Sequence, residues 1–110
     1  MISFDAVIRL IGDVQAEDLR RWIDEAWVRP EGDAQAYVFH EVDVARVRLI
    51  RELRYELAID DEAMPVVLRL LDQVYALRRR LRATRAAIEA QPDEVRRALR
   101  ARLAGWEDEV

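Results

Sequence analysis

The residue types that usually carry catalysis are scarce in this chain. His40 is the only histidine, Ser3 is the only serine, and there is no cysteine. A nucleophilic serine needs a base and an orienting acid, and Ser3, near the terminus, has no such context. A metal centre needs several convergent ligands, and one histidine without a cysteine does not supply them. The three glycines are isolated and form no phosphate-binding loop. We therefore expect a protein that is not an enzyme and has no catalytic residues, metal site or cofactor.

Carboxylates are abundant, and they are unevenly distributed along the chain. Residues 1–60 hold 8 arginines and 13 acidic residues, whereas residues 61–110 hold 10 arginines and 9 acidic residues. An acidic N-terminal half disfavours DNA binding, because affinity for duplex DNA comes mainly from contacts between cations and phosphates. It favours a basic protein partner instead.

The composition is that of a folded protein, with 52% hydrophobic and 36% charged residues. The N-terminus lacks the basic region and apolar run of a signal peptide. No apolar stretch approaches the ~20 residues that a membrane span needs. We expect a cytoplasmic protein that makes no contact with a membrane.

Helical periodicity predicts two short helices at the N-terminus. Ser3 can cap the first, which ends at Gly12-Asp13, and the second runs from Gln15 to Ala26. Two short helices joined by a tight turn form a helix-turn-helix. The β-rich runs at 27–30 and 37–40 then predict a small hairpin, the wing of a winged helix.

Two further helices are predicted before a short C-terminal one. A broad apolar stripe indicates a helix over 41–57 that packs within the globule. Residues 60–90 contain no glycine and predict a long helix that is regular from about residue 61 or 62. Pro92 fits the first turn of the last helix, which ends at Gly105 before an acidic tail at 106–110.

The long helix carries a narrow apolar seam whose spacing alternates between three and four residues, as in a coiled coil. Its members are Val67, Leu70, Val74, Leu77, Leu81 and Ile88. The predicted fold class is therefore mainly α. A winged helix-turn-helix head with a small β-hairpin wing (1–59) is followed by a long dimerising helix and a short C-terminal helix, which form one structural unit (60–110).

Outward positions of the second helix bear on the choice between DNA and protein as a partner. In a helix-turn-helix the second helix normally enters the major groove. Here those positions are drawn from four acidic and two basic residues: Glu17, Asp18, Arg20, Arg21, Asp24 and Glu25. We expect the two arginines to pair with Asp24 and Glu25 at helical spacing rather than to contact phosphate.

Five arginines crowd the second half of the long helix, and we name them the basic cluster: Arg78, Arg79, Arg80, Arg82 and Arg85. Cations suit the C-terminal half of a helix. Aromatic residues that could stack on bases are absent beside them. The sequence therefore favours a solvated helix end over a nucleic-acid site.

The order of these elements resembles the MerR superfamily, and four segments resemble the chaperone-modulator CbpM family more narrowly. The segments are 18–30 (DLRRWIDEAWVRP), Tyr37-Val38-Phe39, 45–53 and 67–74. The similarity runs from about Ser3 to Ile88. Two places depart from the pattern: Ala26 stands where MerR-type heads usually carry glycine, and 63–65 replaces a segment that often contains one.

The resemblance implies a non-enzymatic regulator that binds the J-domain of a DnaJ-like co-chaperone, CbpA, and inhibits it. A J-domain presents a basic helix and a His-Pro-Asp loop to a DnaK-type chaperone, and a protein covering that surface blocks the handover. Association with such a partner would also allow a location at the nucleoid. We expect the contact residues to be acidic, with two apolar anchors: Glu17, Asp18, Asp24, Glu25, Asp60, Asp61, Glu62, Trp27 and Met64.

Two alternatives remain. One is a MerR-like DNA-binding transcriptional regulator, whose contacts would include Arg20 and Arg21. The other is a scaffold whose long helix joins a different protein.

The seam predicts that the chain is a homodimer and that Leu77→Glu breaks the dimer, because a carboxylate would be buried without a partner between two helices. Sedimentation or sizing chromatography at low micromolar concentration measures this. A Leu77→Glu protein that is still dimeric would refute the role of the seam.

Overall fold

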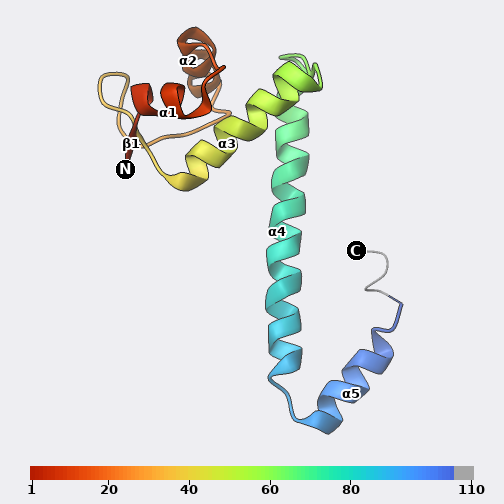
Figure 1. Ribbon diagram of the computed structural model, residues 1–110. Coiled ribbons are helices and arrows are strands. Elements are labelled where there is room, and N and C mark those ends of the chain that lie inside the picture. The colour runs from red at the N-terminus through yellow and green to blue at the C-terminus, as the bar shows by residue number, and fades with distance from the viewer. Residues whose placement is uncertain (106–110) are drawn as a thin grey trace. The chain divides into compact units, whose positions relative to one another are not determined.

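The structure, a computed structural model, describes residues 1–105 and is mainly helical (Figure 1). The elements are β1 (Ile2–Ser3), α1 (Phe4–Ile11), α2 (Ala16–Asp24), β2 (Val38–Phe39), α3 (Glu41–Arg51), the π-helix η1 (Glu52–Glu56), α4 (Met64–Glu89) and α5 (Asp93–Arg102). This is the predicted fold class of a helical winged head followed by a long and a short helix. The predicted acidic tail lies outside the described residues.

The chain divides into two compact units. The first unit is Met1–Leu68 and the second begins at Arg69. The sequence placed this boundary between residues 59 and 60. The boundary lies later because the first turn of α4 belongs to the core of the first unit, where Met64 and Leu68 are buried.

The helix-turn-helix forms as predicted, with a shorter second helix. Ser3 caps α1, its Oγ accepting a hydrogen bond from the backbone N–H of Ala6 (3.1 Å). Helix α2 ends at Asp24 rather than at Ala26, because Ala26 has a positive φ of 61° that no helix can continue. Alanine thus keeps the left-handed turn that glycine usually supplies at this point.

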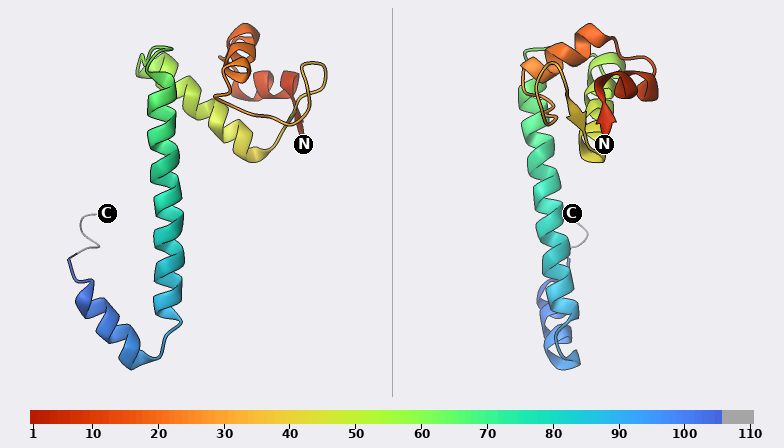
Figure 2. Two further views of the ribbon diagram at one scale, coloured as in Figure 1. Left: turned by 180° about the vertical axis from the view of Figure 1, so that it is seen from behind. Right: turned by 90° about the vertical axis from the view of Figure 1, so that its left-hand side faces the viewer.

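The predicted hairpin is wrong in its pairing. Strand β2 pairs in antiparallel fashion with the N-terminal β1, in the register Ile2 with Phe39 and Ser3 with Val38 (Figure 2). On its other side β2 makes only one bridge, between Val38 and Glu31. Pro30, which has no N–H, precedes that bridge and cannot extend the ladder.

Two buried residues explain why 27–30 is not a strand. Trp27 and Val28 are consecutive, and both are buried in the core. Successive side chains of a strand point to opposite faces, so a strand on the surface could bury only one of them. The wing loop turns at Gly32, whose φ is 89° and where a Cβ would lie 2.4 Å from the carbonyl oxygen of Ala36.

The predicted third helix is two elements. Helix α3 begins after His40, whose backbone N–H donates to Asp43 Oδ2 (2.9 Å), and it gives way to η1 after Arg51. The π-type hydrogen bond from Leu57 N–H to Glu52 C=O (3.1 Å) widens the last turn. Apolar periodicity cannot distinguish this turn from α-helix, because it lasts only five residues.

Helix α4 begins at Met64, after a turn at 61–63, so the predicted start was two to three residues early. Asp60 opens this turn, its Oδ1 accepting from the N–H of Ala63 (2.8 Å). With 26 residues, α4 is about 39 Å long. Helix α5 begins at Asp93, with Pro92 at the N-cap rather than in the first turn, and it ends at Arg102, before the predicted end at Gly105. No helix among residues 1–105 has the length and apolarity to cross a membrane.

The left-handed Ala26 predicts a stabilising substitution. Because Ala26 is exposed and its φ is 61°, Ala26→Gly should raise the free energy of unfolding by about 0.5–1 kcal/mol, relief of backbone strain outweighing the entropy gained by the unfolded chain. Thermal unfolding should show a midpoint a few degrees higher.

The matched control is Ala45→Gly, at an exposed position inside α3. It should lower the free energy of unfolding by about 1 kcal/mol. If both glycine variants are destabilised, Ala26 does not carry the strain.

Candidate functional site

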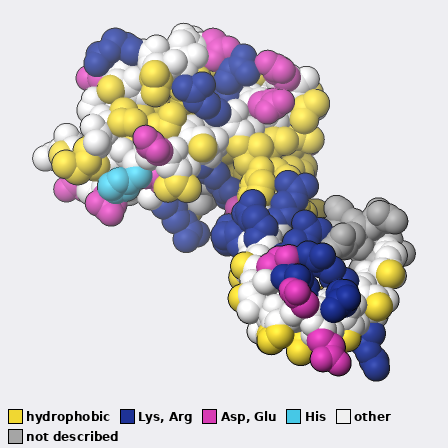
Figure 3. All heavy atoms as spheres, turned by 60° about the horizontal axis from the view of Figure 1, so that its bottom comes forward, with side chains coloured by type: hydrophobic (Ala, Val, Ile, Leu, Met, Phe, Trp, Pro, Cys, Tyr) yellow, Lys and Arg dark blue, Asp and Glu magenta, His cyan; other side chains and the backbone are white. Residues whose placement is uncertain are grey.

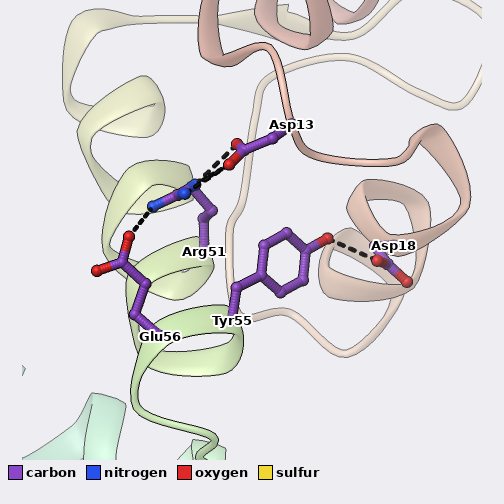
Figure 4. A network of polar contacts seen from close by, with 5 residues as sticks. All are labelled: Asp13, Asp18, Arg51, Tyr55 and Glu56. Atoms are coloured by element: carbon purple, nitrogen blue, oxygen red, sulfur yellow. Dashed lines mark hydrogen bonds and ion pairs between the residues drawn. The ribbon is translucent and has the colours of Figure 1, made fainter.

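The outward face of α2 is the candidate site, and α3 fixes the turn in front of it. Arg51 Nε donates to both carboxylate oxygens of Asp13, at 2.7 and 2.9 Å, and Arg51 Nη1 donates to Glu56 Oε1 at 3.0 Å (Figure 4). Asp13 lies in the turn between α1 and α2. The hydrogen bonds from Arg51 lower the pKa of Asp13, and those with Asp13 and Glu56 raise the pKa of Arg51.

The π-helix makes this arrangement possible. Residues five apart on an α-helix lie about 140° apart around the axis. The wider turn of η1 brings Glu56 round to Arg51 and leaves Arg51 directed at Asp13. One arginine therefore connects the helix-turn-helix to the end of α3.

A second contact holds α2 directly. Tyr55 of η1 donates its phenolic O–H to Asp18 Oδ2 at 2.6 Å (Figure 4), and its ring lies 6.0 Å from that of the buried Trp22. Burial, and then the bond to Asp18, raise the pKa of Tyr55 to about 12. Asp18 is thus partly committed to holding α2 in place.

Both arginines of α2 are engaged, though not with the predicted partners. The Arg20 guanidinium lies 5.1 Å from the centre of the Phe4 ring. Arg21 pairs with Asp61 at 3.2 Å and more loosely with Asp18 at 3.8 Å. The expected pairing with Asp24 and Glu25 is therefore wrong. Asp61 faces α2 because the 57–63 connection returns there, and it also pairs with Arg54 at 3.3 Å.

Three carboxylates of α2 remain unpaired, and we name them the acidic face: Glu17, Asp24 and Glu25. Each is exposed, and none forms an ion pair within residues 1–105. Asp24 and Glu25 stand at the C-terminal end of α2, where the helix dipole disfavours negative charge. Helix stability therefore does not explain their presence.

The other predicted contact residues have different environments. Glu62 is exposed and unpaired among the described residues, whereas the carboxylate of Asp60 caps the turn before α4. The prediction that Trp27 and Met64 act as apolar anchors for a partner needs correction. Trp27 is 5% exposed and Met64 is fully buried, so both belong to the core and neither is available to a partner.

Arg51 and Tyr55 were not singled out from the sequence. Their partners lie 38 and 37 residues away, and no local pattern marks such pairs. A surface hollow beside them is lined by Asp13, Arg48, Arg51, Glu52 and Glu56, charges that largely compensate one another. No cluster of three metal-ligating side chains occurs within residues 1–105.

A helix-turn-helix, a short wing strand and a long following helix define a winged helix-turn-helix regulator. The family model described as MerR HTH family regulatory protein matches residues 3–86, so the chain belongs to that family. Comparison with curated proteins gave no match, and comparison with solved structures gave none either.

The contact between Tyr55 and Asp18 predicts a pH dependence. The pKa of Tyr55 is about 12 in the folded state against an ordinary value of 10. The neutral phenol of Tyr55 therefore makes its full contribution to the free energy of unfolding below pH 10, and this contribution is lost as the pH rises through 12. Tyr55→Phe should lower the free energy of unfolding at neutral pH by about 1 kcal/mol, because the pair is partly exposed to solvent.

Alkaline titration of tyrosinate absorbance checks the assignment. Tyr55→Phe should lose the step near pH 12, and Tyr75→Phe, at an exposed position of α4, should retain it. A step that persists in Tyr55→Phe contradicts it.

Proposed function

We propose that this protein is a chaperone modulator that binds the J-domain of a CbpA-type, DnaJ-like co-chaperone and inhibits its action with a DnaK-type chaperone. The observation that carries the proposal is the acidic face of α2, three exposed carboxylates that have no partner among the described residues. The CbpM-like segments at 18–30, 37–39, 45–53 and 67–74 supply the class of partner.

The electrostatics of α2 suit a basic helix. The two cations of α2 are occupied, Arg20 by the Phe4 ring and Arg21 by Asp61. The helix therefore presents uncompensated negative charge where a DNA-reading helix presents donors to phosphate. Carboxylates that face a basic partner speed association and set its orientation.

The remaining contact residues follow from the structure. Glu62 is the one residue of the predicted acidic trio at 60–62 whose side chain is not engaged within residues 1–105. With Trp27 and Met64 in the core, the acidic residues are left as the proposed contact set. An interface made of such charges binds with fast exchange and is sensitive to salt.

We also propose that the working form is a homodimer joined through the seam of α4. Leu70, Val74 and Leu77 are 56%, 40% and 60% exposed, which is unusual for consecutive seam positions of an isolated helix. Val67, Leu81 and Ile88 are partly exposed on the same stripe. Ala86→Glu, at an exposed position of α4 away from the seam, is the matched control for Leu77→Glu and should leave the dimer intact.

The proposal predicts that reversing the charges at the end of α2 weakens J-domain binding. Asp24→Lys with Glu25→Lys should slow association about 10-fold at low salt and flatten its dependence on salt, because the steering charges are lost. Calorimetry and stopped-flow mixing with the J-domain of the same organism's CbpA-like protein measure both effects.

The matched control reverses two exposed carboxylates elsewhere, Glu41→Lys with Glu52→Lys, and changes the net charge equally. It should bind with nearly wild-type kinetics. The absence of any complex between wild-type protein and J-domain at micromolar concentration would sink the proposal.

The family match favours a second candidate, a MerR-type DNA-binding regulator. In this case Arg20 and Arg21 would leave Phe4 and Asp61 to reach phosphate groups. Binding to operator-like DNA would then fall steeply with salt and would be abolished by Arg20→Gln with Arg21→Gln. Absence of binding to genomic fragments even at low salt removes this candidate.

A further inference from the structure

The second unit carries a charge opposite to that of the first. Residues 69–110 hold ten arginines against seven acidic residues, a net charge of +3, and the segment 78–102 within them holds nine against three, a net charge of +6. Figure 3 shows dark blue basic side chains gathered over this unit. The family model matches residues 3–86, so α5 and its four arginines lie outside the matched residues.

Three arginines of the basic cluster form a line along one face of α4, and the other two lie off this line. Arg78, Arg82 and Arg85 are spaced by four and three residues, which places them on one face of α4 over about 10 Å. Arg79 and Arg80 extend the charge around the helix. All five side chains are exposed.

Acidic neighbours neutralise only part of this charge. Asp93 pairs with Arg96, and Glu89 pairs with Arg100 of α5. Four arginines of the basic cluster form no ion pair within residues 1–105: Arg78, Arg79, Arg80 and Arg82.

Helix stability does not account for the cluster. Arginines four apart repel each other by about 0.2–0.5 kcal/mol per pair. The helix dipole acts within the last turn, whereas Arg78 to Arg82 lie at least seven residues before the end of α4 at Glu89. A dense group of like charges that the fold does not need indicates an anionic partner.

The chemistry of the patch favours a nucleic-acid backbone. Guanidinium groups match phosphate with paired hydrogen bonds, and the cations of this patch are arginines, as they are throughout this lysine-free chain. Residues 76–105 contain no aromatic side chain and Tyr75 is the single aromatic of α4, so stacking on successive bases is poorly supported and a duplex is favoured over a single strand. A helix that lies on a membrane needs an exposed apolar face, and the apolar seam of α4 is the face proposed above to be covered in the homodimer.

We propose that the basic cluster of α4, with the arginines of α5, binds the phosphate backbone of double-stranded DNA without sequence preference. This activity is separate from J-domain binding by the first unit, and it does not use α2. It assigns to the basic cluster a role that the sequence alone disfavoured.

The test is fluorescence anisotropy of the full-length protein with a short labelled duplex of random sequence, titrated over a range of salt concentrations. Wild-type protein should bind at about 50 mM salt, with a logarithmic salt slope of about −0.9 for each phosphate contacted. Arg78→Gln, Arg79→Gln and Arg82→Gln combined should weaken binding at least ~10-fold and reduce the slope by up to about 2.7. Circular dichroism and J-domain binding should be unchanged in this variant.

Two controls locate the contact. Arg9→Gln, Arg29→Gln and Arg48→Gln combined remove the same charge from exposed positions of the first unit and should change affinity by less than about 2-fold. Arg20→Gln with Arg21→Gln should also retain binding.

Three results would overturn the proposal: no duplex binding at about 50 mM salt, loss of binding in either control but not in the cluster variant, or preference for anionic lipid vesicles over the duplex. Loss of J-domain binding alone would count against the proposed function and leave this inference standing.

Discussion

The contact between Arg51 and Asp13 is the interaction that ties the helix-turn-helix to the end of α3. One guanidinium holds the turn of the helix-turn-helix from the end of α3, with Nε 2.7 and 2.9 Å from the two carboxylate oxygens. The same group holds Glu56, which only the wide turn of η1 can bring round to it. The irregular end of α3 is therefore part of what orients α2.

The orientation of α2 determines which charges are available. Tyr55 binds Asp18 and Asp61 binds Arg21, so the connection between α3 and α4 engages one carboxylate and one arginine of α2. Phe4 takes up the other arginine. What remains is Glu17, Asp24 and Glu25, a face that repels phosphate and attracts a basic surface.

The two units differ in charge, and the two partners proposed for them differ accordingly. An acidic α2 suits a basic helix, and an arginine-rich α4 and α5 suit a phosphate backbone. The net charge of −4 for the whole chain conceals this division. Because charges beyond about 10 Å are screened at ordinary salt, each surface acts according to its local charge rather than the total.

The sequence by itself determined the α-helices and their approximate limits, the helix-turn-helix, the apolar periodicity of α4 and the acidic character of the N-terminal half. These follow from periodicity, capping residues and composition, which are local properties. Tertiary structure alone decided the pairing of β2 with β1, the π-turn at η1, the burial of Trp27 and Met64, and the partners of Arg20, Arg21 and Arg51. Apart from the short π-turn, each depends on residues far apart in the chain, and a side chain's local pattern does not reveal which distant group packing will bring to it.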